Sequence, residues 1–223
     1  MNFKAGALLV CASMLFQGGC TSKVVNPEQY SGFLSDYNGL AETKSPSGAV
    51  VMRWIQPGVD ASKYKRLYIE PSQFYPKPQA SATVPQMTLD GIAGYYDQAL
   101  NREFSKTLPI VMTPSAGTLI VRPAITAVSA KTQGLHVYEV IPIALVAAGI
   151  SAATGIRDQD TNIATEAEFV DATDGRVVAK VVRKGAGKTL ANSSQVMKAA
   201  DVKAVLDGWA SDMHLSFEKI KDN

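Results

Sequence analysis

The sequence contains little cysteine, with only Cys11 and Cys20 among its 223 residues. Cys11 lies in an apolar stretch near the N-terminus that we expect to be removed from the mature protein. One cysteine then remains, so no disulfide can form within a mature chain. The fold must therefore be stabilised by its hydrophobic core.

Histidines and catalytic motifs are also scarce. His136 and His214 are far apart and have no HExxH spacing, so a zinc site is not expected, and His214 is predicted to lie on a helix surface. There is no GxSxG motif. GAGKT at residues 185–189 lacks the first glycine of a phosphate-binding loop, where the chain has Val182. We expect no metal and no cofactor.

Neither sign of charge is in excess. Residues 1–19 contain one cation, Lys4, and no acidic residue, so removing them leaves 21 lysines and arginines against 20 acidic residues. A nearly neutral domain of this kind is not expected to bind nucleic acid.

Long apolar runs are rare, and the first lies near the N-terminus. Residues 5–16 follow the single cation Lys4 and are too few to cross a bilayer, which takes roughly 20 residues in a helix. The small residues Gly18 and Gly19 come next, directly before Cys20. This arrangement is typical of a signal peptide over residues 1–19.

The small residues before Cys20 resemble the lipobox of bacterial lipoproteins. A lipobox usually has leucine three positions before the cysteine, where this chain has Gln17. The resemblance implies cleavage between Gly19 and Cys20, and attachment of lipid to the thiol of Cys20. An aspartate after the cysteine favours retention at the inner membrane, and this chain has Thr21 there. We therefore expect a lipid anchor in the outer membrane, on its periplasmic face.

A second apolar run covers residues 140–156, seventeen positions without a charged residue. It is shorter than a membrane span and is interrupted by Pro142, Gly149 and Gly155. Three interpretations stay open: a buried part of the domain's own core, a contact with a partner or a second copy, and insertion into the bilayer. The residues expected to make such a partner or membrane contact are Val140, Ile141, Ile143, Leu145, Val146 and Ile150.

The mature chain is expected to have two parts. Residues 20–48 are predicted to be the lipidated N-terminus and a polar tether, with a short docking segment at 30–40 and a loop at 42–48. Aromatic residues and leucines recur at helix-like spacing in the docking segment. Residues 49–223 are predicted to form one periplasmic domain.

Hydrophobic patterning indicates five strands and two helices in that domain. The predicted strands cover residues 49–55, 66–70, 118–129, 162–170 and 176–184, and the predicted helices cover 86–106 and 195–220. Pro123 should limit its strand to an edge or a bulge, and an Asp-Gly turn at 174–175 makes the last two strands an antiparallel hairpin. We therefore predict the α+β class: an antiparallel or mixed sheet with two main helices packed on one face, preceded by the lipidated tether.

Two glutamates stand out on the predicted hairpin. Glu166 and Glu168 are two positions apart, so both project from one face of the strand. Paired carboxylates of this kind can carry hydrolase chemistry. The alternative, which we expect, is that both lie on the solvent-exposed face of the hairpin.

Several short stretches of the mature chain match one family in order. They are GFLSDY at 32–37 with Leu40, RWI at 53–55, PGVD at 57–60 with Tyr64 and Lys65, IEP at 69–71, EAE at 166–168, DA at 171–172 and DGR at 174–176. The chain in this respect resembles the uncharacterised bacterial lipoproteins grouped as DUF3313. The resemblance implies an envelope lipoprotein of Gram-negative bacteria and assigns no catalytic residue.

These expectations lead to three hypotheses about function. The first is a lipid-anchored, non-catalytic module that binds another envelope component. The second is a structural subunit of an oligomeric envelope or secretion assembly that uses residues 140–156 as its interface. The third is a hydrolase that uses Glu166 or Glu168.

Overall fold

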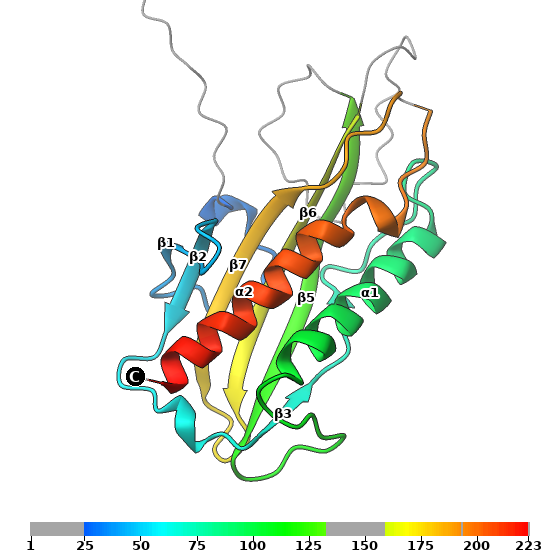
Figure 1. Ribbon diagram of the computed structural model, residues 1–223. Helices are drawn as coiled ribbons and strands as arrows, with labels where there is room; N and C mark the ends of the chain where they lie inside the picture. The colour runs from blue at the N-terminus through cyan, green and yellow to red at the C-terminus, as the bar shows by residue number, and fades with distance from the viewer. Residues whose placement is uncertain (1–24, 133–158, 193, 223) are drawn as a thin grey trace, which may run out of the picture.

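The computed structural model describes residues 25–132, 159–192 and 194–222. A mixed sheet of seven strands carries two long helices on one of its faces (Figure 1). The predicted α+β class, with two main helices on one face of the sheet, is confirmed. Gly19, Cys20 and the apolar run at 140–156 lie outside the described residues.

The strands follow one another across the sheet in a defined order. This order is β1 (Ala41–Lys44), β2 (Val50–Ile55), β7 (Val177–Ala186), β6 (Gln159–Asp171), β5 (Thr118–Thr132) and β3 (Arg66–Ile69), with the short β4 (Gln73–Phe74) also paired to β5. β3 and β4 run parallel to β5, and the other pairs are antiparallel. The helices are α1 (Gln86–Phe104) and α2 (Lys203–Lys221).

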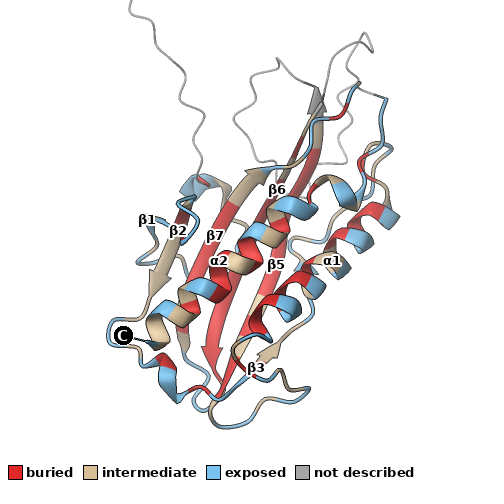
Figure 2. Ribbon diagram, in the orientation of Figure 1, coloured by how far each residue is buried: buried red, intermediate tan, exposed pale blue. Residues whose placement is uncertain are grey.

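The alternating pattern predicted an antiparallel hairpin, and β6 and β7 form it in the middle of the sheet. Ile163 and Ala167 of β6 belong to the hydrophobic core and are at most 1% exposed. Figure 2 shows the central strands buried behind the two helices. Gly175 ends the turn with a φ of +74°, a conformation that glycine adopts without strain. Local propensity and core packing therefore agree in this element.

Pro123 lies within β5, which is an interior strand rather than an edge. On one side of β5, Pro123 is opposite Ala167 of β6. On the other side, β3 pairs with β5 as far as Val121 and β4 begins pairing at Ala124, so Pro123 faces the interruption between them. Proline has no N–H to donate to a sheet, and this position needs none. The prediction of an edge or a bulge at Pro123 is therefore wrong: β5 does have a bulge, but it lies between Ile125 and Ala127.

The two helices bury the apolar stripes that predicted them. On α1, the residues Leu89, Ile92, Tyr96, Leu100 and Phe104 are all almost inaccessible to solvent. α2 begins at Lys203, so the prediction of a start at 195 is wrong. The backbone of Met197 instead bonds to α1 and the residues before it: its N–H donates to the carbonyl of Thr83, and its carbonyl accepts from the hydroxyl of Thr88. These bonds hold the stretch before α2 in a non-helical conformation.

The chain between residues 25 and 44 packs on the sheet. The loop predicted at 42–48 is wrong in its first part, because residues 41–44 form β1 and pair with β2. The preceding segment, residues 25–40, crosses the sheet face opposite the helices and contains one short 3-10 turn, Pro27–Gln29, rather than a longer helix. Its first residue, Val25, is only 3% exposed, so the predicted polar tether ends before it.

Candidate functional site

The two glutamates singled out by the sequence lie on the face of β6 that points away from the helices. Their predicted exposure to solvent is wrong: Glu166 and Glu168 are 1% and 2% exposed. The cause is the segment at 25–40, which covers this part of the sheet. A carboxylate buried in this way needs hydrogen bonds or an ion pair to compensate for its lost hydration.

Glu166 receives two hydrogen bonds from the covering segment. The backbone N–H of Ser31 donates to its Oε1 atom at 2.9 Å, and the Tyr37 hydroxyl donates to its Oε2 atom at 2.6 Å. Burial, together with this bond to Glu166, raises the pKa of Tyr37 to about 12, so the hydroxyl keeps its proton at neutral pH. Both oxygens of Glu166 are therefore occupied as acceptors.

Glu168 is held in the same manner, with one bond to the segment and one to the sheet. The backbone N–H of Ser35 donates to its Oε1 atom. Arg122 of β5 donates from Nη1 to the Oε2 atom at 3.4 Å. Both oxygens of this carboxylate are also occupied.

Lys180 of β7 provides the opposite charge. It is directly across the ladder from Glu168, and its side chain is 3% exposed. Its Nζ atom donates to Oδ1 of Asp36 at 2.7 Å and to the carbonyl of Asn38 at 3.0 Å, and it lies 4.7 Å from the ring centre of Trp54. The hydrogen bond from Lys180 lowers the pKa of Asp36. Three buried charges of the sheet therefore bind residues 31–38.

Apolar contacts complete the attachment. Val25 and Leu34 pack against Val182 on the outer face of β7. The rings of Tyr30 and Tyr37 stack with their centres 4.3 Å apart. We call Glu166, Glu168 and Lys180 the clasp, and the segment at 25–40 the strap that it holds.

Gly39, the last residue but one of the strap, lies against the indole ring of Trp54. Its φ is +76°, and a Cβ atom there would lie 2.4 Å from the indole ring. Only glycine permits both the conformation and the close approach without rearrangement.

His214 is not on the surface of α2, so that prediction is wrong. It is 5% exposed, and its Nε2 atom lies 2.7 Å from the hydroxyl of Thr107 and 3.3 Å from Glu218. Its ring also meets Phe104 edge to face, with 6.2 Å between the ring centres. Since α2 packs against α1 and the turn that follows α1, this histidine is part of the contact between the helices.

The described part of the chain meets neither the requirements of a metal-binding cluster nor those of a membrane-spanning helix. No group of three or more His, Cys, Asp or Glu residues there is arranged to hold a metal ion. Among the same residues, no helix is both long and apolar enough to cross a membrane.

A sequence-family comparison identifies the chain. A model described as "Protein of unknown function (DUF3313)" matches residues 29–213, which include the strap from Gln29 onward, the clasp, α1 and the first part of α2. The chain belongs to the DUF3313 family. The family predicted from short sequence stretches is therefore confirmed.

Two curated proteins are similar to this DUF3313 chain over most of its length. Both are named "Uncharacterized lipoprotein YdcL", from Escherichia coli K12 and from Escherichia coli O157:H7. Each is 42% identical over 199 residues, which cover 89% of this chain and 90% of the relative.

Two solved structures are distantly similar to this DUF3313 protein. A PelC dodecamer from Paraburkholderia phytofirmans is 11% identical with a TM-score of 0.39, and the match covers 73% of this chain and 96% of that one. Protein XCC0632 from Xanthomonas campestris is 14% identical with a TM-score of 0.38, covering 74% and 91%. At these TM-scores the likeness carries no conclusion about assembly or activity.

Proposed function

We propose that this protein is a non-catalytic binding or accessory module of the cell envelope, anchored to the periplasmic face of the outer membrane through lipid on Cys20. In this proposal the clasp fixes one face of the domain toward the membrane. The name of the Escherichia coli relatives, lipoprotein, supports the anchor. The signal-like residues 1–19 and Thr21 support the location.

The burial of Val25 is the observation that carries this proposal. Only five peptide units separate Val25 from Cys20, so a fully extended chain spans at most about 17 Å between them. The strap is in turn held by buried charges. A lipid on Cys20 therefore holds the domain close to the bilayer and restricts how it can turn.

The occupied clasp supports a role without catalysis. A hydrolase that uses two carboxylates needs both of them to face the substrate, one as an acid and the other as a base or nucleophile. All four oxygens of Glu166 and Glu168 accept hydrogen bonds, and both side chains are buried under the strap. A substrate would have to displace the strap to reach them.

Replacing the anchor residue tests the proposal. Each methylene group of an acyl chain that is buried in the bilayer adds ~0.8 kcal/mol to the free energy of membrane binding, and the proposed anchor has three such chains. The parent protein should therefore fractionate with the outer membrane. Mass spectrometry should find its mature chain starting at residue 20 with lipid attached. Cys20→Ser should be absent from the outer-membrane fraction and should not be processed to start at residue 20.

Cys11→Ser is the matched control, because it removes a thiol from the apolar part of the signal. It should be processed and localised like the parent. A parent chain with an unmodified Cys20 thiol, or with a mature end at another residue, would contradict the proposal.

A further inference from the structure

An apolar groove opens on the helix face of the sheet, away from the clasp. In Figure 1 α2 crosses the sheet obliquely, and its C-terminal end reaches the end of β2. The C-terminal half of α2, β2 and β7 form the walls of this groove. Six apolar side chains provide much of its lining: Ile55, Val59, Phe169, Met213, Phe217 and Ile220.

The size of the groove favours a narrow ligand. Its free interior is about 60 Å³, several times the ~10–15 Å³ that one water molecule needs. A space of this size takes one section of an extended aliphatic chain and is too small for a fused ring system, so the rest of a longer chain would extend past the open mouth. Half-buried Ile55, Val59 and Ile220 leave its mouth open to solvent.

Two arginines lie on the same wall of the groove. Arg53 of β2 is opposite Val181 of β7, so Arg183, two residues further along β7, is its diagonal neighbour. Both side chains project to the helix face and line the groove. Burial, with the nearby charge of Arg183, lowers the pKa of Arg53.

Only one carboxylate compensates for these two cations. Asp212 accepts a hydrogen bond from Nη1 of Arg183 at 3.0 Å, and both of its oxygens also accept from Ser47. Arg53 donates to the hydroxyl of Ser216 at 3.2 Å and has no ion pair within the described part of the chain. The groove therefore carries one uncompensated positive charge.

A buried donor without a partner adds a second, independent observation. The Nε–H group of Arg183 is a hydrogen-bond donor that is inaccessible to solvent and has no partner among the described residues, and the whole side chain is only 4% exposed. An unpaired buried donor costs about 1–3 kcal/mol, so it is normally satisfied by a ligand or a water molecule.

We propose that the groove binds a single-chain anionic amphiphile, whose aliphatic chain packs along α2 and whose carboxylate or phosphate group pairs with Arg53 and Arg183. Guanidinium groups suit both head groups because their donors form a planar fork. Apolar walls with a few placed polar groups are the usual composition of such sites. This binding site is independent of the proposed membrane anchoring, because the groove and the clasp lie on opposite faces of the sheet.

Calorimetric titration of the full mature chain, residues 20–223, tests the proposal. The chain carries Cys20→Ser, so that it needs no detergent and has no acyl chain of its own to compete. The probes are dodecanoate, dodecyl phosphate, 1-dodecanol and dodecyltrimethylammonium, each below its micelle concentration. We expect saturable 1:1 binding of the two anions. Dodecanol should bind at least tenfold more weakly, because it lacks the charge-assisted hydrogen bonds.

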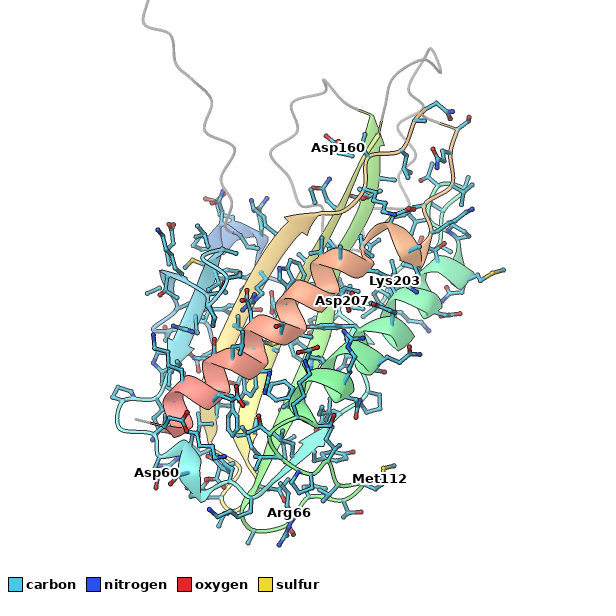
Figure 3. All side chains as sticks on the ribbon, viewed as in Figure 1. Asp60, Arg66, Met112, Asp160, Lys203 and Asp207 are labelled. Carbon is cyan, nitrogen blue, oxygen red and sulfur yellow. The ribbon has the colours of Figure 1, made fainter. Side chains whose placement is uncertain are left out.

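The Arg53→Gln variant identifies the site. It should weaken binding of the anions about ten- to hundredfold, the usual effect of losing a hydrogen bond to a charged group. Arg66→Gln is the matched control, because Arg66 is exposed on β3 at the other edge of the sheet (Figure 3). Its affinity should stay within twofold of the parent.

A groove-filling variant covers the case in which Arg53→Gln does not fold. Ile220→Trp adds volume at the half-buried end of α2 and should abolish binding while the helical circular dichroism is kept. Tighter binding of either anion supports the site. A preference for dodecanoate would indicate a fatty acid as the ligand, and a preference for dodecyl phosphate would indicate a phospholipid-derived ligand. Absence of saturable binding by both anions, or equal binding of dodecanol, would overturn the proposal.

Discussion

Replacing Asp212 by alanine is expected to lower the free energy of unfolding by about 3–5 kcal/mol, the usual effect of breaking a buried ion pair. Asp212 is 2% exposed, and it is the ion-pair partner of Arg183 and the acceptor for Ser47. Without it, Arg183 stays buried beside Arg53 with no carboxylate between the two cations. The measurement is urea denaturation of the C20S mature chain, followed by circular dichroism.

Asp207→Ala is the control for the Asp212 variant. Asp207 lies on the same helix (Figure 3). It pairs with Arg102, but both side chains are exposed to about two-fifths or more. An exposed pair of this kind contributes at most about 1 kcal/mol. If Asp212→Ala lost no more stability than Asp207→Ala, the interpretation of Asp212 as a buried counter-ion would be wrong.

A double variant separates the ion pair from its surroundings. Asp212→Leu combined with Arg183→Met replaces two buried charges by apolar groups of similar length, which is often neutral or stabilising. The free energy of unfolding of the double variant should therefore be much closer to that of the parent than the value for Asp212→Ala alone. A double variant as unstable as the single one would show that Ser47 and local packing, rather than the charge on Arg183, explain the effect.

The contribution of Asp212 also has a defined pH range. Burial alone would raise the pKa of Asp212, but hydrogen bonds from Ser45, Arg183 and Ser47 outweigh it and hold the pKa below its ordinary value of 3.8. A carboxyl whose folded pKa is lowered stabilises the fold above its unfolded pKa. This stabilisation is therefore complete at neutral pH and is lost as the pH falls below about 4.

Removing the clasp carboxylates should release the strap. In the Glu166→Ala, Glu168→Ala variant, the amides of residues 25–40 are expected to exchange hydrogen at least a hundredfold faster. Hydrogen bonds to charged groups contribute about 1.5–3 kcal/mol each, and two of the four lost bonds come from strap amides. Hydrogen exchange with mass spectrometry measures this directly. Exchange in α1 and α2 should stay as in the parent, because the helices lie on the other face.

Glu70→Ala is the matched control for the clasp variant. Glu70 follows β3 and pairs with Arg122, as Glu168 does, but it makes no hydrogen bond to the strap among the described residues. Its replacement should leave strap exchange unchanged. Equal exchange of the strap in the parent and in the double variant would mean that Lys180 and the apolar contacts of Val25 and Leu34 hold it without the two carboxylates.

Local patterns explain why much of the fold was predictable. The stripe on α1 and the alternation in β6 arise from contacts of neighbouring turns and strands, which the spacing of apolar residues records directly. The start of α2 was not predictable in this way. It depends on bonds between Met197 and residues 83–88, more than a hundred positions away in the sequence.

The site was only half predictable for the same reason. Alternation placed Glu166 and Glu168 on one face, but it did not reveal that the strap covers that face. One signal could have suggested a paired site: the register set by the hairpin turn puts Lys180 opposite Glu168. Arg53, Arg183 and Asp212 come from three elements, so no local pattern connects them.

Neutron reflectometry of the lipidated mature protein on a supported bilayer tests the central claim, that the strap holds the domain against the membrane. With five peptide units between Cys20 and Val25, the protein layer should begin within about 17 Å of the bilayer surface. In the Glu166→Ala, Glu168→Ala variant the released chain extends from Cys20 to β1 and can span about 70 Å when fully extended. The protein layer of this variant should therefore be thicker and more diffuse. A parent layer as distant and diffuse as that of the clasp variant would contradict the account.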